Sequence, residues 1–134
     1  LRYENIRSAR AEEGVIRLML LSPDLFRQAA AQGLEPEQFS APVLGKTYRL
    51  LRARWEQGLQ VQLAGLAGEL SGEEMSHVAS ITDQPESAAH AVQALRDYIA
   101  VIQTEAQRRS GGDQIALLRA AQKKYKENKS YGGS

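Results

Sequence analysis

Few residues of this sequence combine the side-chain type and the spacing that catalysis or metal binding needs. The chain has two histidines, His77 and His90, and no cysteine, so neither a Cys/His zinc set nor a thiol nucleophile can form. Acidic pairs occur at three places, which are Glu12-Glu13, Glu35/Glu37 and Glu73-Glu74. Because acids are favoured in the first turn of a helix, we interpret all three as capping or solvated residues. The sequence therefore predicts no catalytic, cofactor-binding or metal-binding residue, and a chain that is not itself an enzyme.

Positive charge is concentrated at the C-terminal end of the chain. Residues 1–105 carry 10 Lys and Arg against 14 Asp and Glu, whereas residues 106–134 carry 7 against 2. A basic end on an acidic body is typical of a segment that contacts an acidic protein surface or the backbone of a nucleic acid. The alternative is a solvated helix face, whose cations suit the negative end of the helix dipole.

A second basic run also contains aromatic residues and could bind phosphate groups. It comprises Lys46, Tyr48, Arg49, Arg52, Arg54 and Trp55. Its aromatic residues form an apolar stripe with Leu51, and two of its arginines share another face. We therefore interpret this run as an ordinary amphipathic helix.

The length and composition predict an all-α domain with a core of its own. The chain has 134 residues, of which 43% are hydrophobic and 25% charged. β-branched residues are sparse and never alternate over the length of a strand. No apolar run approaches a membrane span and no signal peptide opens the chain, so we expect a cytoplasmic protein without membrane contact. The first residue is Leu1 rather than Met, which predicts a piece of a longer protein.

Apolar periodicity and capping residues predict a small multi-helix bundle in the first part of the chain. The predicted segments are residues 6–21, 22–33, 35–39, 41–57, 63–70 and a helix that starts at residue 71. The short turn at residues 35–39 is expected to point Phe39 inward. Ser71 and Glu74 fit a capping box, in which each side chain bonds the backbone N–H of the other residue.

The last part of the chain predicts a protruding antiparallel helical hairpin. One uninterrupted helical pattern covers residues 85–109, with apolar residues at steps of four and three. Ser110-Gly111-Gly112 breaks this pattern, and Asp113 can cap a final helix to about residue 129. We therefore predict a bundle over residues 1–85 and a hairpin over residues 86–134. The apolar stripes of the hairpin need a cover, which is the body, another protein, or a second copy in a homodimer.

Several short motifs follow one another in an order that one family shares. Residues 12–24, EEGVIRLMLLSPD, place acids before a Leu-rich helix that ends in a Ser-Pro-Asp turn. LEPEQF at residues 34–39 and the aromatic-bearing helix around YRLL at residues 48–51 come next, and long terminal helices follow. In this order the chain resembles, over nearly its whole length, the C-terminal helicase-binding domain of bacterial DNA primase.

The resemblance implies a fold and a partner. The family has a helical bundle, here at residues 1–85, and a helical hairpin, here at about residues 86–130. Its domain docks on the N-terminal collar of the hexameric replicative helicase, which recruits primase to the replication fork for RNA primer synthesis and stimulates the helicase. The catalytic domains of primase have no counterpart in this chain, so no catalytic residue is carried over and no cofactor is implied.

The N-terminal collar domain of the replicative helicase is similar in fold and pattern, and it stays the alternative. That domain usually carries a His near its aromatic-bearing helix and an Asp after the following Gly. Ser40-Ala41-Pro42 and Gly58-Leu59-Gln60-Val61 stand at those places here. The basic segment at residues 123–126, followed by a Gly-rich stub, also favours primase. A third hypothesis is a basic helical nucleic-acid-binding module that uses the tail with Tyr125 and Tyr131.

The predicted helicase-binding residues lie on the last predicted helix. Its apolar anchors are Ile115, Leu118, Ala121 and Tyr125, and its basic rim is Lys123, Lys124 and Lys126. A few such anchors commonly supply most of the binding energy of an interface, whereas rim charges mainly set the association rate. We expect the bundle to make a second, weaker contact, and the basic tail to be a weak contact for nucleic acid.

Overall fold

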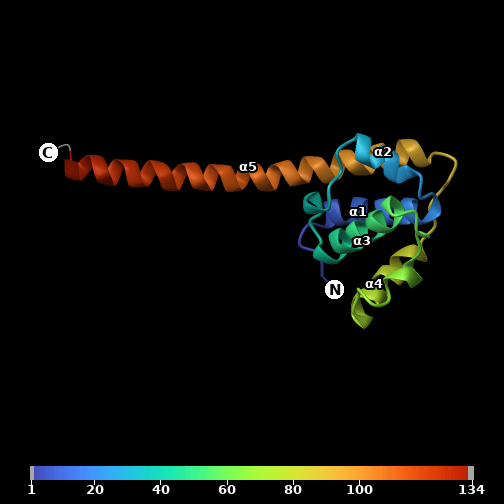
Figure 1. Ribbon diagram of the computed structural model, residues 1–134. Coiled ribbons are helices and arrows are strands. Elements are labelled where there is room, and N and C mark those ends of the chain that lie inside the picture. The colour runs from blue at the N-terminus through green and yellow to red at the C-terminus, as the bar shows by residue number, and fades with distance from the viewer. Residues whose placement is uncertain (1, 133–134) are drawn as a thin grey trace.

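The computed structural model describes residues 2–132, without the side chains of residues 112–117 and 120–132. Its helices are α1 (Ile6–Leu21), α2 (Leu25–Ala31), α3 (Pro42–Glu56), α4 (Gly72–Thr82) and α5 (Ala91–Gly132), with short 3-10 helices η1 (Pro36–Gln38) and η2 (Leu63–Leu66). No residue between 2 and 132 lies in a strand. The predicted all-α, multi-helix bundle is confirmed, and Figure 1 shows α5 projecting from it.

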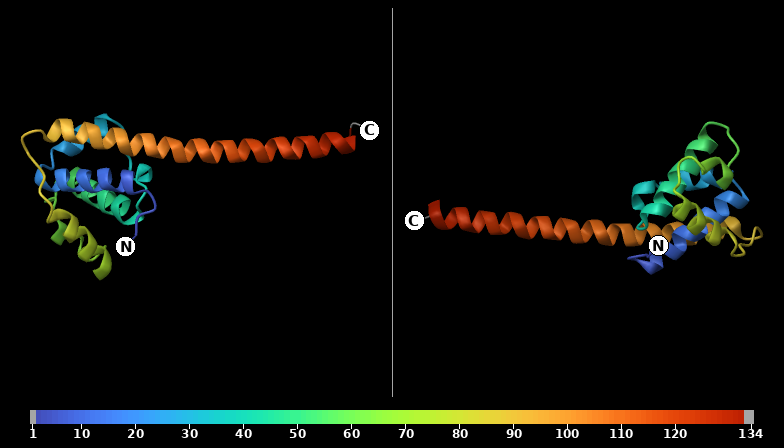
Figure 2. Two further views of the ribbon diagram at one scale, coloured as in Figure 1. Left: turned by 180° about the vertical axis from the view of Figure 1, so that it is seen from behind. Right: turned by 90° about the horizontal axis from the view of Figure 1, so that it is seen from below.

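The bundle is built around α1. This helix contacts α5 most extensively, and it also packs against α3, α4 and α2 (Figure 2). Its fully buried face contains Val15, Ile16, Leu18 and Met19. α5 contributes Leu95, Ile99 and Ile102 to the same core, each at most 1% exposed. The core of the bundle therefore extends past residue 85 into the first half of α5.

Local signals explain most of the helix boundaries. The Asn5 side chain caps α1 by accepting the Ser8 N–H at 3.0 Å. Gly33 and Gly58 follow α2 and α3 with φ near +72° and +73°, a conformation that glycine adopts without a steric penalty. The capping box at the start of α4 is confirmed, with bonds of 3.1 Å and 2.8 Å between Ser71 and Glu74.

The turn before α3 is also confirmed. η1 occupies Pro36–Gln38, and Phe39 directly after it is 7% exposed. The Phe39 ring stacks on Tyr48 of α3 with ring centroids 4.8 Å apart. The turn thus contributes an aromatic side chain to the core, as its sequence predicts.

The predicted C-terminal hairpin is wrong for this structure. α5 is one helix of 42 residues, about 63 Å long, and it passes through Ser110 and Gly111 without a turn (Figure 1). A glycine inside a helix costs only about 1 kcal/mol relative to alanine, whereas a chain reversal gives up the backbone bonds of two helix ends. The strong helix formers on both sides of Ser110 and Gly111 therefore keep α5 continuous at these two residues. Its predicted start at residue 85 is wrong too, because residues 85–90 form a non-helical link to α4.

Candidate protein-interaction site

The outer part of α5, residues 110–132, leaves the bundle. The Arg109 side chain donates from Nη2 to the carbonyl oxygen of Gln38 at 3.2 Å, and it is the last described side chain of α5 that bonds the bundle. Beyond it, α5 has no other element of the described chain beside it (Figures 1 and 2). This part of α5 is therefore a helix that extends away from the packed bundle.

One predicted partner-binding residue on this part of α5 is described. Leu118 is 62% exposed, the highest value among the large hydrophobic side chains described as exposed. Other exposed apolar residues are Ile6, Leu21, Leu59 and Val92, and single exposed apolar residues are normal on protein surfaces. The side chains of Ile115, Ala121, Lys123, Lys124, Tyr125 and Lys126 lie outside the described residues.

The buried Glu12 carboxylate joins α1 to the start of α3. Its Oε2 accepts from Ser8 Oγ at 2.6 Å and from the Ser40 N–H and Oγ at 2.8 and 2.6 Å, and its Oε1 accepts from the Ala41 N–H at 3.0 Å. α3 has no capping side chain of its own at Ala41, so Glu12 is its anionic cap. The interpretation of Glu12 as a first-turn residue is wrong, since it lies in the middle of α1 and caps another helix.

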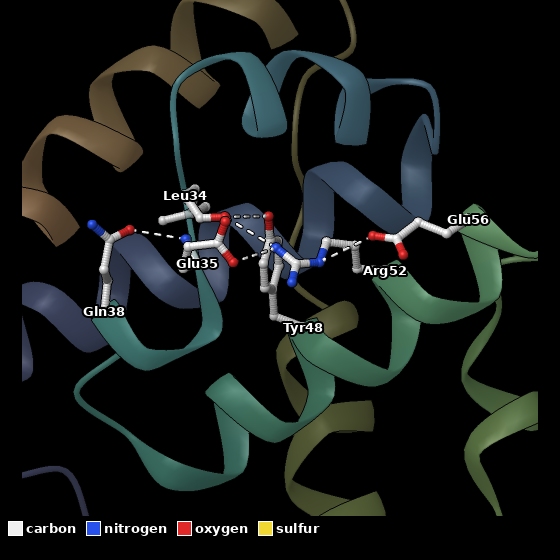
Figure 3. Close-up of polar contacts among 6 residues, drawn as sticks. All are labelled: Leu34, Glu35, Gln38, Tyr48, Arg52 and Glu56. Carbon is white, nitrogen blue, oxygen red and sulfur yellow. Dashed lines mark hydrogen bonds and ion pairs between the residues drawn. The ribbon is translucent and has the colours of Figure 1, made fainter.

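A polar cluster joins the turn that contains Leu34 and Glu35 to α3 (Figure 3). The Arg52 Nη1 donates to Glu35 Oε2 at 2.9 Å and to the carbonyl oxygen of Leu34 at 3.4 Å, and its Nε lies 3.4 Å from Glu56 Oε1. The Tyr48 hydroxyl donates to the same Leu34 carbonyl at 3.2 Å. Burial raises the pKa of Tyr48 to about 12, so this phenol stays a neutral donor at physiological pH.

Other cations of the basic-aromatic run are also used within the fold. Lys46 Nζ pairs with Glu74 Oε1 at 3.0 Å, and Arg54 Nε donates to the carbonyl oxygen of Gln60 at 2.7 Å. The Trp55 ring packs on Phe26, with centroids 5.8 Å apart. These contacts support the interpretation of α3 as an amphipathic helix rather than a phosphate-binding element.

Neither histidine belongs to a ligand cluster. His77 Nε2 lies 2.5 Å from the Tyr3 hydroxyl, with the rings in an edge arrangement, and His90 is exposed just before α5. Across the described residues, no group of three or more His, Asp or Glu side chains is placed to hold a metal ion.

Sequence reasoning missed a groove beside α1. It has a volume of about 920 Å³ and is lined by Arg2, Arg7, Arg10 and Arg17. The signal in the sequence was the spacing of Arg7, Arg10 and Arg17, which places them along one side of a helix with 3.6 residues per turn.

Comparisons with known proteins add no family to this description. No family model matches the chain, and neither does any curated protein or solved structure. Within the described residues, no helix is both long enough and apolar enough to cross a membrane. The structure thus defines a class, an all-α bundle with a projecting helix.

Proposed function

We propose that this chain is the helicase-binding domain of a bacterial DNA primase. It would dock on the N-terminal collar of the hexameric replicative helicase, recruit primase to the replication fork for RNA primer synthesis, and stimulate the helicase. The order of sequence motifs motivates the family. The projecting part of α5 is the observation that carries the docking role.

The projecting helix supports a docking role because of its length and its exposure. Residues 110–132 provide about 35 Å of helix at 1.5 Å per residue, and the bundle does not cover it. Leu118 is exposed on this part of the helix. An apolar residue on a free helix is suited to a groove of a partner protein, where it leaves water.

The motifs that carry the resemblance have structural tasks in the bundle. Glu12 caps α3, and Phe39 packs on Tyr48. A Cβ at Gly14 would overlap the ring of Tyr98, so glycine permits the close approach of α1 and α5. The motifs therefore stabilise the bundle, and we expect the residues of α5 to determine which partner is bound.

The test is a calorimetric titration of this chain into the replicative helicase of the same bacterium. We expect the wild-type chain to bind and a chain truncated after Arg109 to lose binding. Leu118→Asp should weaken binding at least about tenfold, because a buried interface anchor is commonly worth about 2 kcal/mol.

Val92→Asp is the matched control. Val92 is 40% exposed on the same helix but lies in its first turn, where an acidic residue is tolerated. Its binding should equal that of the wild type. No binding by a folded wild-type chain would overturn the proposal. Oligomers formed without helicase, detected by light scattering, would favour the helicase-collar alternative.

A further inference from the structure

The groove beside α1 gathers positive charge on an otherwise acidic body. Its walls come from α1, from α5, from the segment before α1 and from Gln84 in the link between α4 and α5. The four arginines that line it, Arg2, Arg7, Arg10 and Arg17, belong to the 10 Lys and Arg of residues 1–105, which also carry 14 acids. Such a concentration of one sign in a concave site raises the local concentration of an oppositely charged ligand.

Three of the four arginines, Arg2, Arg7 and Arg10, are exposed and available to a ligand. Arg7 Nε lies 3.5 Å from Glu105 Oε1, but the Arg7 side chain is 74% exposed, so water screens this pair. Arg2 and Arg10 form no ion pair with any residue that the structure describes. Glu13 is the one carboxylate among the described lining residues, and it accepts the hydroxyl of Tyr3 at 2.6 Å.

Arg17 is the least exposed of the four arginines, and one of its donors has no partner among the described residues. Its Nε is 3.2 Å from Glu86 Oε1, and its side chain is 12% exposed. Its Nη1 is buried and has no hydrogen-bond partner among the described residues. A buried N–H without a partner costs free energy. This nitrogen is closed to solvent, so a ligand oxygen reaches it only after the side chain turns into the groove, where the two form a charge-assisted bond.

Two tyrosines give the groove aromatic surface. Tyr98 lies against Gly14 and donates its hydroxyl to Glu86 Oε1 at 3.0 Å. Tyr3, on the segment before α1, is held by Glu13 and His77. Both rings are half-buried and fixed in place, which makes them suitable surfaces for stacking.

We infer that this groove binds single-stranded nucleic acid through its phosphates. All four lining cations are arginine, whose planar fork pairs with two phosphate oxygens at once. Arg7 and Arg17 are about 15 Å apart along α1, so the row of arginines is long enough to contact more than one phosphate of a single strand. The tyrosines provide the aromatic faces on which single-stranded bases stack. This site is separate from the projecting helix and does not depend on the helicase proposal.

The test is fluorescence anisotropy of a labelled oligo-dT of about 12 nucleotides with the full chain at several salt concentrations. Arg2→Ala/Arg10→Ala should weaken binding at least about tenfold, because each charge-assisted bond lost is commonly worth a factor of about ten. The slope of log K against log salt should fall by about 1.4, which is the value for two phosphate contacts on a single strand.

Arg27→Ala/Arg49→Ala is the matched control. It removes the same charge from exposed positions of α2 and α3 outside the groove, and every variant keeps the basic tail. Its affinity should stay close to that of the wild type. Equal weakening by both double variants, or no binding by the wild type, would overturn the inference. Binding of a poly-glutamate peptide but not of oligo-dT, lost in Arg2→Ala/Arg10→Ala, would also overturn it in favour of an acidic-peptide site.

Discussion

The two halves of α5 share one backbone conformation and differ in what surrounds them. Residues 91–109 lie against α1, with Leu95, Ile99 and Ile102 buried in the core. Residues 110–132 project from the bundle, where Leu118 is exposed. Helices in proteins take most of their stability from packing rather than from intrinsic propensity. The inner half should therefore contribute most to the stability of the fold, whereas the outer half should contribute little.

The two halves of α5 should differ most in what a truncated apolar side chain costs. Ile99→Ala removes a side chain that is 1% exposed, and it should lower the free energy of unfolding by about 3 kcal/mol. Leu118→Ala on the outer half should change it by less than about 0.5 kcal/mol. Urea unfolding followed by circular dichroism measures both. Equal losses would mean that the outer half is also packed in solution.

Glu12→Gln comes next in size and tests what holds α1 to α3. A neutral amide cannot accept as strongly from the Ser40 and Ala41 N–H groups, and its NH₂ must face one of these donors. We expect a loss of about 2 kcal/mol in the free energy of unfolding, because hydrogen bonds to charged groups are worth about that much. Glu4→Gln, at an exposed position just before α1, is the control and should leave the stability unchanged. A Glu12→Gln variant as stable as the wild type would contradict the assignment of Glu12 as the cap of α3.

The continuity of α5 can be tested with two spin labels. The chain has no cysteine, so Thr104→Cys and Arg119→Cys provide unique attachment sites, both exposed. A continuous helix places their backbones about 22 Å apart, whereas a hairpin at residues 110–112 would bring the two arms to about 10 Å. Gly111→Ala should leave the distance unchanged and favour the helix by about 1 kcal/mol. A short distance in the wild type that lengthens in Gly111→Ala would show that the hairpin forms in solution.

The sequence was sufficient for features that depend on neighbouring residues. The Ser71–Glu74 capping box and the turn that points Phe39 inward were both predicted, because each involves residues a few positions apart. α1 was predicted with the bounds that the structure has. Periodicity and caps act locally, so they can be recognised without knowledge of the fold.

Features that depend on distant residues were not predictable in this way. Glu12 caps α3 across 28 and 29 residues of sequence, and the groove combines the N-terminal segment with α5. The course of α5 through Ser110 and Gly111 was missed for another reason. A helix break and a tolerated glycine differ by about 1 kcal/mol, and local sequence does not decide so small a difference. The partner-binding residues stay predictions, since only Leu118 among them is described.

Acid should weaken the start of α4 slightly, through the carboxylate of Glu74. The backbone N–H of Ser71, with help from Lys46, holds the pKa of Glu74 below its ordinary value of 4.5. A carboxylate whose pKa is lowered by folding stabilises the folded state above the pKa of the unfolded chain, and this stabilisation is lost as pH falls through the folded value.

Glu74→Gln keeps an acceptor for Ser71 but removes the charge, so the stability gap between wild type and variant should be small at pH 7 and close below pH about 4.5. Glu73→Gln, next to it in the same first turn, should show a smaller gap, because Glu73 has no bond to Ser71 or Lys46 among the described contacts. Urea unfolding at several pH values measures both gaps, and a gap for Glu74→Gln that widens in acid would contradict the lowered pKa.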